Sequence, residues 1–103
     1  MNCAARRRVT ASQDLIVVTE LRNDTPEDMH LYLEMVPEQL VMAPGHEVAL
    51  LARRSPDLLP IHISFVSDGL QVHAHKEVDP DWHVRFRGKV LKVEALTRLA
   101  DHE

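Results

Sequence analysis

Residues 61–75 are the stretch that most restricts how this chain folds. Two runs of alternating apolar and polar residues flank Asp68-Gly69, and such a dipeptide between alternating runs is a strong signal for a β-hairpin with a two-residue turn. The turn requires a positive φ at Gly69 and fixes the register of the two strands. The predicted cross-strand pairs are Ser67 with Leu70, Phe65 with Val72, Ser64 with His73, Ile63 with Ala74 and His62 with His75.

The two faces of this hairpin differ in chemistry, because successive side chains of a strand point to opposite faces. One face is apolar and is predicted to lie in the core; it carries Ile61, Ile63, Phe65, Leu70, Val72 and Ala74. The other face is predicted to be exposed; it carries His62, Ser64, Val66, Gln71, His73 and His75. Across the whole chain, the residues predicted to be largely buried are Leu33, Phe65, Val72, Val84 and Phe86.

Similar short segments, separated by turn residues, occupy most of the chain. The expected strands cover residues 15–21, 29–35, 39–42, 47–52, 82–86 and 90–94, in addition to the central hairpin. Pro44-Gly45 predicts a type II turn, and Arg87-Gly88 predicts a second two-residue hairpin with Trp82 on its inner face. Seven or eight short strands without a long amphipathic helix predict an all-β fold, a single small antiparallel β-sandwich.

The length of 103 residues suits one domain with one core. Residues 1–12 are predicted to be a disordered basic arm and residues 13–97 to form the β-sandwich domain. Residues 98–103 are predicted to be a frayed tail, with one helical turn over residues 96–103 as the alternative. The only cysteine is Cys3, which excludes an intramolecular disulfide.

Charge and hydropathy restrict the location and the partners. The formal net charge is −4 with acids and bases interspersed, so neither nucleic acid nor an anionic membrane is expected as a partner. No apolar run approaches the roughly 20 residues of a membrane span, and no apolar signal segment follows the basic N-terminus. A cytoplasmic location is the expectation.

The turn and strand signals in residues 15–52 follow a familiar order. Leu21-Arg-Asn-Asp-Thr25 comes first, then Leu31-Tyr-Leu-Glu34, then Pro44-Gly45 before a strand. This order resembles that of small, uncharacterised single-domain β-sandwich proteins of bacteria. The resemblance implies the fold, and it implies no activity.

The predicted register brings three histidines together as candidate metal ligands, with water or a carboxylate such as Glu77 as a fourth. His62, His73 and His75 share the polar face of the central hairpin, with His62 directly opposite His75. Neutral imidazoles that converge in this way bind Zn²⁺, Cu²⁺ or Ni²⁺. Two other interpretations stay open: an exposed polar face that happens to use histidine, and a pH-sensitive face of clustered imidazoles.

Two further groups of charged residues have ordinary interpretations beside functional ones. Asp79, Asp81 and His83 place two carboxylates near an imidazole, which suits acid–base chemistry, but Pro80 favours a simple turn. A basic cluster around the second hairpin comprises Arg85, Arg87, Lys89 and Lys92. Basic β-ribbons bind phosphate backbones, but no exposed aromatic residue accompanies this one, and nucleic-acid binding is not expected.

No nucleophile motif or phosphate-binding glycine loop occurs in the sequence, so an enzyme is not expected. The favoured hypothesis is a non-enzymatic module for protein–protein interaction or self-association, because sandwiches leave unpaired strand edges. Apolar residues on faces predicted to be exposed support this hypothesis; they are Leu51, Val66 and Val90. The alternative is a metal- or pH-responsive binding module that uses the three histidines.

Overall fold

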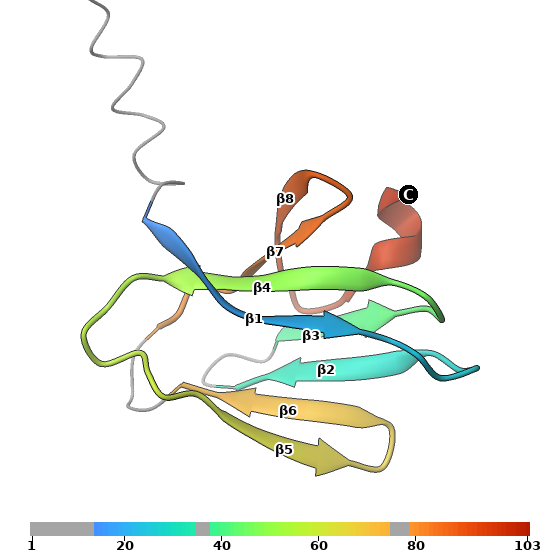
Figure 1. Cartoon of the computed structure of the whole chain (residues 1–103), viewed down its shortest axis with the longest axis horizontal. Helices are drawn as coiled ribbons and strands as arrows, with labels where there is room; N and C mark the ends of the chain where they lie inside the picture. Colours follow the sequence, from blue (N-terminus) through green and yellow to red (C-terminus); the bar gives the residue numbers. More distant parts are fainter. Residues whose placement is uncertain (1–13, 35–37, 75–78) are drawn as a thin grey trace, which may run out of the picture.

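The computed structural model describes residues 14–34, 38–74 and 79–103. In this part of the chain nine β-strands form two sheets, and the single helix is the short 3-10 helix η1 (Leu99–His102) (Figure 1). The all-β prediction is therefore confirmed, although the strands number nine rather than seven or eight. No helix among the described residues is long and apolar enough to cross a membrane.

The first sheet is antiparallel throughout and has the strand order β1-β4-β7-β8. Its strands are β1 (Leu15–Arg22), β4 (Glu47–Arg53), β7 (His83–Phe86) and β8 (Lys89–Lys92). The predicted turn between β7 and β8 is confirmed. Arg87 and Gly88 have φ angles of 53° and 81°, and Phe86 lies opposite Lys89, as a two-residue turn with two positive φ angles requires.

The second sheet has the order β5-β6-β2-β3-β9 and is mixed, so the prediction of a purely antiparallel fold is wrong here. Its strands are β5 (His62–Val66), β6 (Gly69–His73), β2 (Met29–Leu33), β3 (Glu38–Met42) and the two-residue β9 (Thr97–Arg98). The pairs β2–β6 and β3–β9 are parallel. Parallel pairing needs a crossover connection, and the chain makes both crossovers through strands of the first sheet. Turn signals do not encode that path.

One cluster of buried side chains draws on both sheets. It includes Leu31, Leu33, Leu40, Met42, Val48, Leu50, Ala52, Val72, Trp82, Val84, Phe86 and Leu99. The predicted burial of Leu33, Val72, Val84 and Phe86 is confirmed. The sequence pattern places Leu51 on an exposed face, but Leu51 is buried, because β4 is a central strand in which Val17 and His83 flank Leu51 on either side.

The predicted turn at Pro44-Gly45 is confirmed. Gly45 has a φ of 85°, and the His46 amide donates to the Ala43 carbonyl at 3.0 Å, as expected of a type II turn. The buried side chain of Asn23 braces this corner by donating to the Met42 carbonyl at 2.8 Å.

The register predicted for the central hairpin is wrong, because the turn lies one residue earlier. Phe65 pairs with Leu70 and Val66 with Gly69, which leaves Ser67 and Asp68 as the loop. Gly69 begins β6 and does not have a positive φ. The cross-strand partner of each residue therefore differs by two positions from the predicted partner. Because this shift is even, each face of the hairpin carries the residues predicted for it.

Close backbone approach explains the glycine at position 69. Gly69 pairs with His30 of the parallel neighbour β2, and an added Cβ atom would lie 1.8 Å from the His30 carbonyl oxygen. Only glycine fits there without moving a strand. The same residue that signals a turn in the sequence serves a contact between strands in the fold.

The last residues form the helical turn that was the alternative to a frayed tail. Leu99 of η1 is buried in the core, and the buried imidazole of His46 contacts the Glu103 carboxylate. Nδ1 of His46 accepts the Ala43 amide at 3.0 Å, so Nε2 carries the proton and donates to Glu103. This hydrogen bond, with the nearby Arg87 guanidinium, holds the pKa of Glu103 below its ordinary value.

Candidate functional site

The most unusual surface of the molecule surrounds β5, and we call it the β5 surface. Its members are the exposed large apolar residues in and just before this strand: Leu59, Ile63, Phe65 and Val66, with Val66 on the face of β5 opposite Ile63 and Phe65. Phe65 is 85% exposed, although the sequence pattern predicts that it is buried. Every residue of β5 is exposed, whereas the core side of a strand in a two-layer fold is normally covered.

The position of β5 explains why the prediction for Phe65 is wrong. β5 is the outermost strand of its sheet, and β6 separates it from the other strands (Figure 1). Phe65 shares a face with Leu70 and Val72, as predicted, but burial falls off along that face from Val72, which is fully buried, through the half-buried Leu70 to Phe65. Alternation identifies which residues share a face, and it does not show how far the opposite sheet reaches.

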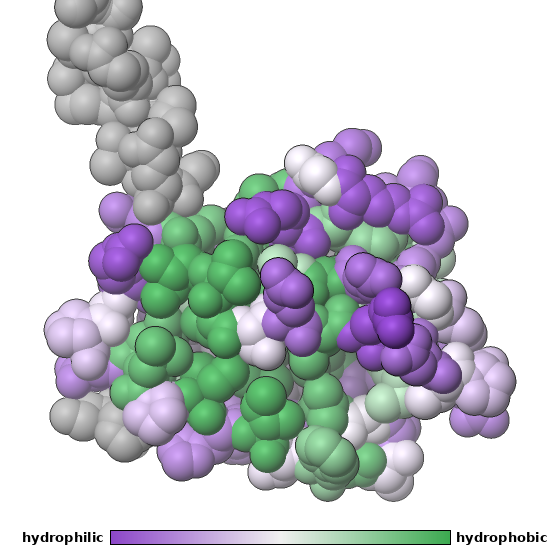
Figure 2. Space-filling view, in the orientation of Figure 1, coloured by the Kyte–Doolittle hydropathy of each residue, from purple (hydrophilic) through white to green (hydrophobic). Residues whose placement is uncertain are grey.

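The apolar surface continues from β5 toward β1. Figure 2 shows hydrophobic side chains gathered over the region that Figure 1 assigns to β1 and the β5–β6 hairpin, with polar side chains around them. Partly buried apolar residues that pack against the core include Ile16 and Val18 of β1, Leu70 of β6 and Ile61. Large contiguous apolar patches are uncommon on monomers and mark interaction sites.

A small cavity of about 80 Å³ adjoins this region. Its wall includes Leu21, Met29, Leu31, Met42 and Leu70, and Leu70 is the direct cross-strand partner of Phe65. The volume is well below the roughly 300–1,000 Å³ of sites that bind small molecules. A cavity of this size admits at most one apolar group of a larger partner.

The structure brings together two of the three histidines predicted as metal ligands. His62 lies directly opposite His73, and not opposite His75 as the predicted register required. His75 lies outside the described residues. Within them, no group of three or more histidine, cysteine or acidic side chains is arranged to hold a metal ion. The three-histidine site stays a prediction.

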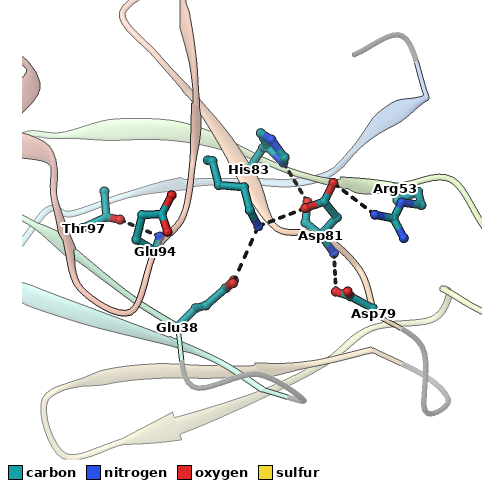
Figure 3. Close-up of polar contacts among 8 residues, drawn as sticks. Glu38, Arg53, Asp79, Asp81, His83, Glu94 and Thr97 are labelled. Atoms are coloured by element: carbon teal, nitrogen blue, oxygen red, sulfur yellow. Dashed lines mark hydrogen bonds and ion pairs between the residues drawn. The ribbon is translucent and has the colours of Figure 1, made fainter. Parts of the chain in front are cut away.

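Asp81 is the centre of a polar cluster that joins the two sheets (Figure 3). Its carboxylate lies 2.9 Å from Lys92 Nζ in β8 and 3.3 Å from Arg53 Nη2 at the end of β4. Lys92 Nζ also lies 3.7 Å from Glu38 Oε2 in β3. The cluster therefore connects β8 and β4 of the first sheet to β3 of the second.

The hydrogen bonds around Asp81 do not suit acid–base catalysis. Asp79 Oδ1 accepts the Asp81 amide at 3.0 Å, which is ordinary turn chemistry, and His83 Nδ1 donates to the Asp81 carbonyl at 2.7 Å. Although burial opposes it, the hydrogen bond and charge of Lys92 hold the pKa of Asp81 below its ordinary value. A carboxylate held ionised between two cations is a poor proton carrier near neutral pH, so the turn interpretation is the better one.

The basic residues of the second hairpin do not form a set of free cations. Lys92 is paired with Asp81. Arg87 lies over the Phe86 ring, 5.1 Å from its centroid, and 3.8 Å from Glu103 Oε2. Two of the four positive charges are thus balanced by carboxylates, which weakens the case for a phosphate-binding ribbon.

No protein-family model, curated protein or solved structure matches this chain. The resemblance to small bacterial β-sandwich proteins therefore stays a prediction. Any function has to be argued from the surface itself.

Proposed function

We propose that this chain is a small, non-enzymatic β-sandwich that acts as a module for protein–protein interaction or self-association through the β5 surface. The observation that carries the proposal is the 85% exposure of Phe65 on the outermost strand of a sheet. Leaving such a side chain in water forgoes roughly 1.5–3 kcal/mol of burial. A partner that covers it recovers this free energy.

The chemistry of the β5 surface fits a protein partner better than a small ligand. Aromatic side chains supply most of the binding energy in many protein interfaces, and the side chain of Phe65 is 85% exposed. The adjoining cavity is too small for a metabolite. The carboxylates of the polar cluster around Asp81 are already engaged in ion pairs.

Light scattering and NMR test this proposal. As the chain is concentrated from micromolar to millimolar, we expect the mass to rise and amide resonances of β5 and β6 to shift. Phe65→Ser should abolish both effects. Val90→Ser is the matched control, because Val90 is a 50% exposed apolar residue on β8 of the other sheet. A wild-type chain that stays monomeric, with no Phe65-dependent binding of an apolar dye, would contradict the proposal.

One observation supports a second candidate function, a metal- or pH-responsive module. The observed register makes His62 and His73 direct cross-strand neighbours, and His75, which lies outside the described residues, follows two positions later in the sequence. Titration with Zn²⁺ or Ni²⁺, followed by the imidazole resonances, is the test. Micromolar binding that is lost in His73→Ala and weakens on acidification supports the site. Scattered shifts over all seven histidines at millimolar metal would leave a polar surface.

A further inference from the structure

The free edge of β5 carries the main-chain groups of two apolar residues. In the parallel pair, the Glu34 amide donates to the Val72 carbonyl at 2.9 Å, so the main chain of Val72 faces β2. Bonding directions alternate along a strand, and Gln71 therefore faces β5, where its partner is Ser64. It follows that the N–H and C=O groups of Ile63 and Phe65 point away from β6, to the outer edge.

β5 itself has none of the charges, prolines or bulges that keep sheet edges apart. Natural edges use lysine and other charges, proline, bulges or very short strands. β5 reads His62-Ile-Ser-Phe-Val66 and contains no acidic or basic side chain apart from histidine, and no proline. It pairs with β6 without a register shift. The nearest following charge is Asp68, whose carboxylate accepts the Tyr32 hydroxyl at 2.7 Å.

We propose that β5 pairs antiparallel with β5 of a second copy of this chain, about a two-fold axis at Ser64. This inference rests on the proposed function and names its partner. The register centred on Ser64 is the one in which all five residues of β5 find a partner in the other strand. It places Ile63 of each copy opposite Phe65 of the other and brings the outward main-chain groups of both residues into hydrogen-bonded pairs.

In this register, the side chains of the two β5 strands complement each other. Uncharged Ser64 meets its own copy at the axis, so no like charges oppose one another. Ile63 and Phe65 of both copies form one apolar group of four on the face that, farther into each sheet, carries Leu70 and the buried Val72. A closed two-fold pair also removes both exposed edges.

The available area sets the strength of the pair. Phe65 exposes 85% of its surface, and an aromatic side chain offers about 150–250 Å², so two copies contribute roughly 250–400 Å². A specific interface buries at least about 1,000 Å², and Ile63, Val66 and the strand edges must supply the rest. The expected dimer is weak, with a dissociation constant on the order of micromolar or higher.

Disulfide trapping tests the register. In a Cys3→Ser background, Ser64→Cys places a thiol at the axis in a non-hydrogen-bonded pair, where the Cα atoms lie about 4.5 Å apart, within the range of a disulfide. Ser67→Cys is the matched control, because residues 67 of the two copies would lie roughly 20 Å apart along the strands. We expect mild oxidation to give a covalent dimer with Ser64→Cys and none with Ser67→Cys.

A charge at the axis tests the same pairing without oxidation. Ser64→Lys puts two ammonium groups opposite each other and should weaken self-association more than about tenfold, whereas Ser67→Lys should change it less than about twofold. Phe65-dependent association that is insensitive to Ser64→Lys and gives no Ser64→Cys dimer would overturn the β5 pairing and leave the proposed function standing. A wild-type chain that shows no association at millimolar concentration would overturn the β5 pairing alone, and only the added absence of Phe65-dependent binding of an apolar dye would overturn the proposed function as well.

Discussion

The two hairpins carry the same kind of turn signal and use it differently. In β7–β8, Arg87 and Gly88 form the turn with positive φ angles, and nothing lies within 4 Å of a Cβ atom added to Gly88. In β5–β6, Gly69 lies in the strand, where an added Cβ atom would overlap the His30 main chain. A dipeptide that signals a turn predicts the position of the turn only where no tertiary contact requires the glycine elsewhere.

Their apolar faces differ as well. The inward side chains of β7, Val84 and Phe86, are buried, because β4 pairs with β7 and the second sheet contributes to the same core. The equivalent side chains of β5 lie beyond the covered part of their sheet, and Phe65 is exposed. Alternating apolar residues therefore mark a core strand in one hairpin and an exposed strand in the other.

The largest expected effect comes from truncating one phenylalanine in each hairpin. Phe86→Ala should lower the free energy of unfolding by about 3–5 kcal/mol, because it leaves a cavity in the core. Phe65→Ala should change it by less than about 0.5 kcal/mol, as is usual for an exposed side chain. Urea unfolding measured at low protein concentration, where the chain is monomeric, makes the comparison.

A large loss of stability in Phe65→Ala would mean that β5 belongs to the core after all. The Val90→Ala variant is the control for an exposed apolar residue in the other hairpin, since Val90 is 50% exposed. It should behave like Phe65→Ala in unfolding and unlike it in self-association.

The two glycines give the second comparison. Gly69→Ala should cost about 3 kcal/mol, because its Cβ atom must displace the main chain of His30. Gly88→Ala has free space and should cost only about 1–2 kcal/mol for the left-handed backbone that Gly88 adopts at φ 81°. The measurement is thermal or urea unfolding. Equal losses of stability in the two variants would show that β2 and β6 can move apart to admit the Cβ atom at little cost in free energy.

Sequence reasoning identified most strands, the Pro44-Gly45 turn and the β7–β8 register, because each depends on local chemistry. It missed the parallel pairs, since nothing local to β2 or β6 shows that the chain returns to the same sheet through the other one. It also misplaced the β5–β6 turn, because the contact that requires glycine at position 69 comes from His30, 39 positions earlier. These are long-range effects on local preferences.

The candidate site shows the same division. Alternation predicts which residues share a face with Phe65. The prediction still holds in the structure, because the register of the hairpin differs from the predicted one by an even number of positions. That this face is uncovered at β5 depends on the number and order of strands in both sheets. Of the three apolar residues that suggested an interaction surface, Val66 of β5 and Val90 of β8 are exposed, and Leu51 is buried.

The smallest expected effect concerns pH and the cluster that ties the β7–β8 hairpin to β3. Burial raises the pKa of Glu38 above its ordinary value, against the attraction of Lys92. The folded chain therefore holds this proton more tightly than the unfolded chain, so the ionised carboxylate of Glu38 lowers the stability of the fold at neutral pH. This loss of stability disappears as the pH falls through the raised pKa toward the ordinary value of 4.5. Glu38→Gln should stabilise the fold at pH 7, by less than about 1 kcal/mol, and have little effect near pH 4.

Asp81→Asn is the control with the opposite sign. The pKa of Asp81 is lowered in the folded chain, where Lys92 outweighs burial, so its carboxylate stabilises the fold at neutral pH. That contribution is lost as pH falls below 3.8 through the lowered value. Urea unfolding of both variants from pH 3 to pH 8 should give opposite slopes. If Glu38→Gln proved less stable than wild type at pH 7, the Lys92 ion pair would outweigh the burial of Glu38.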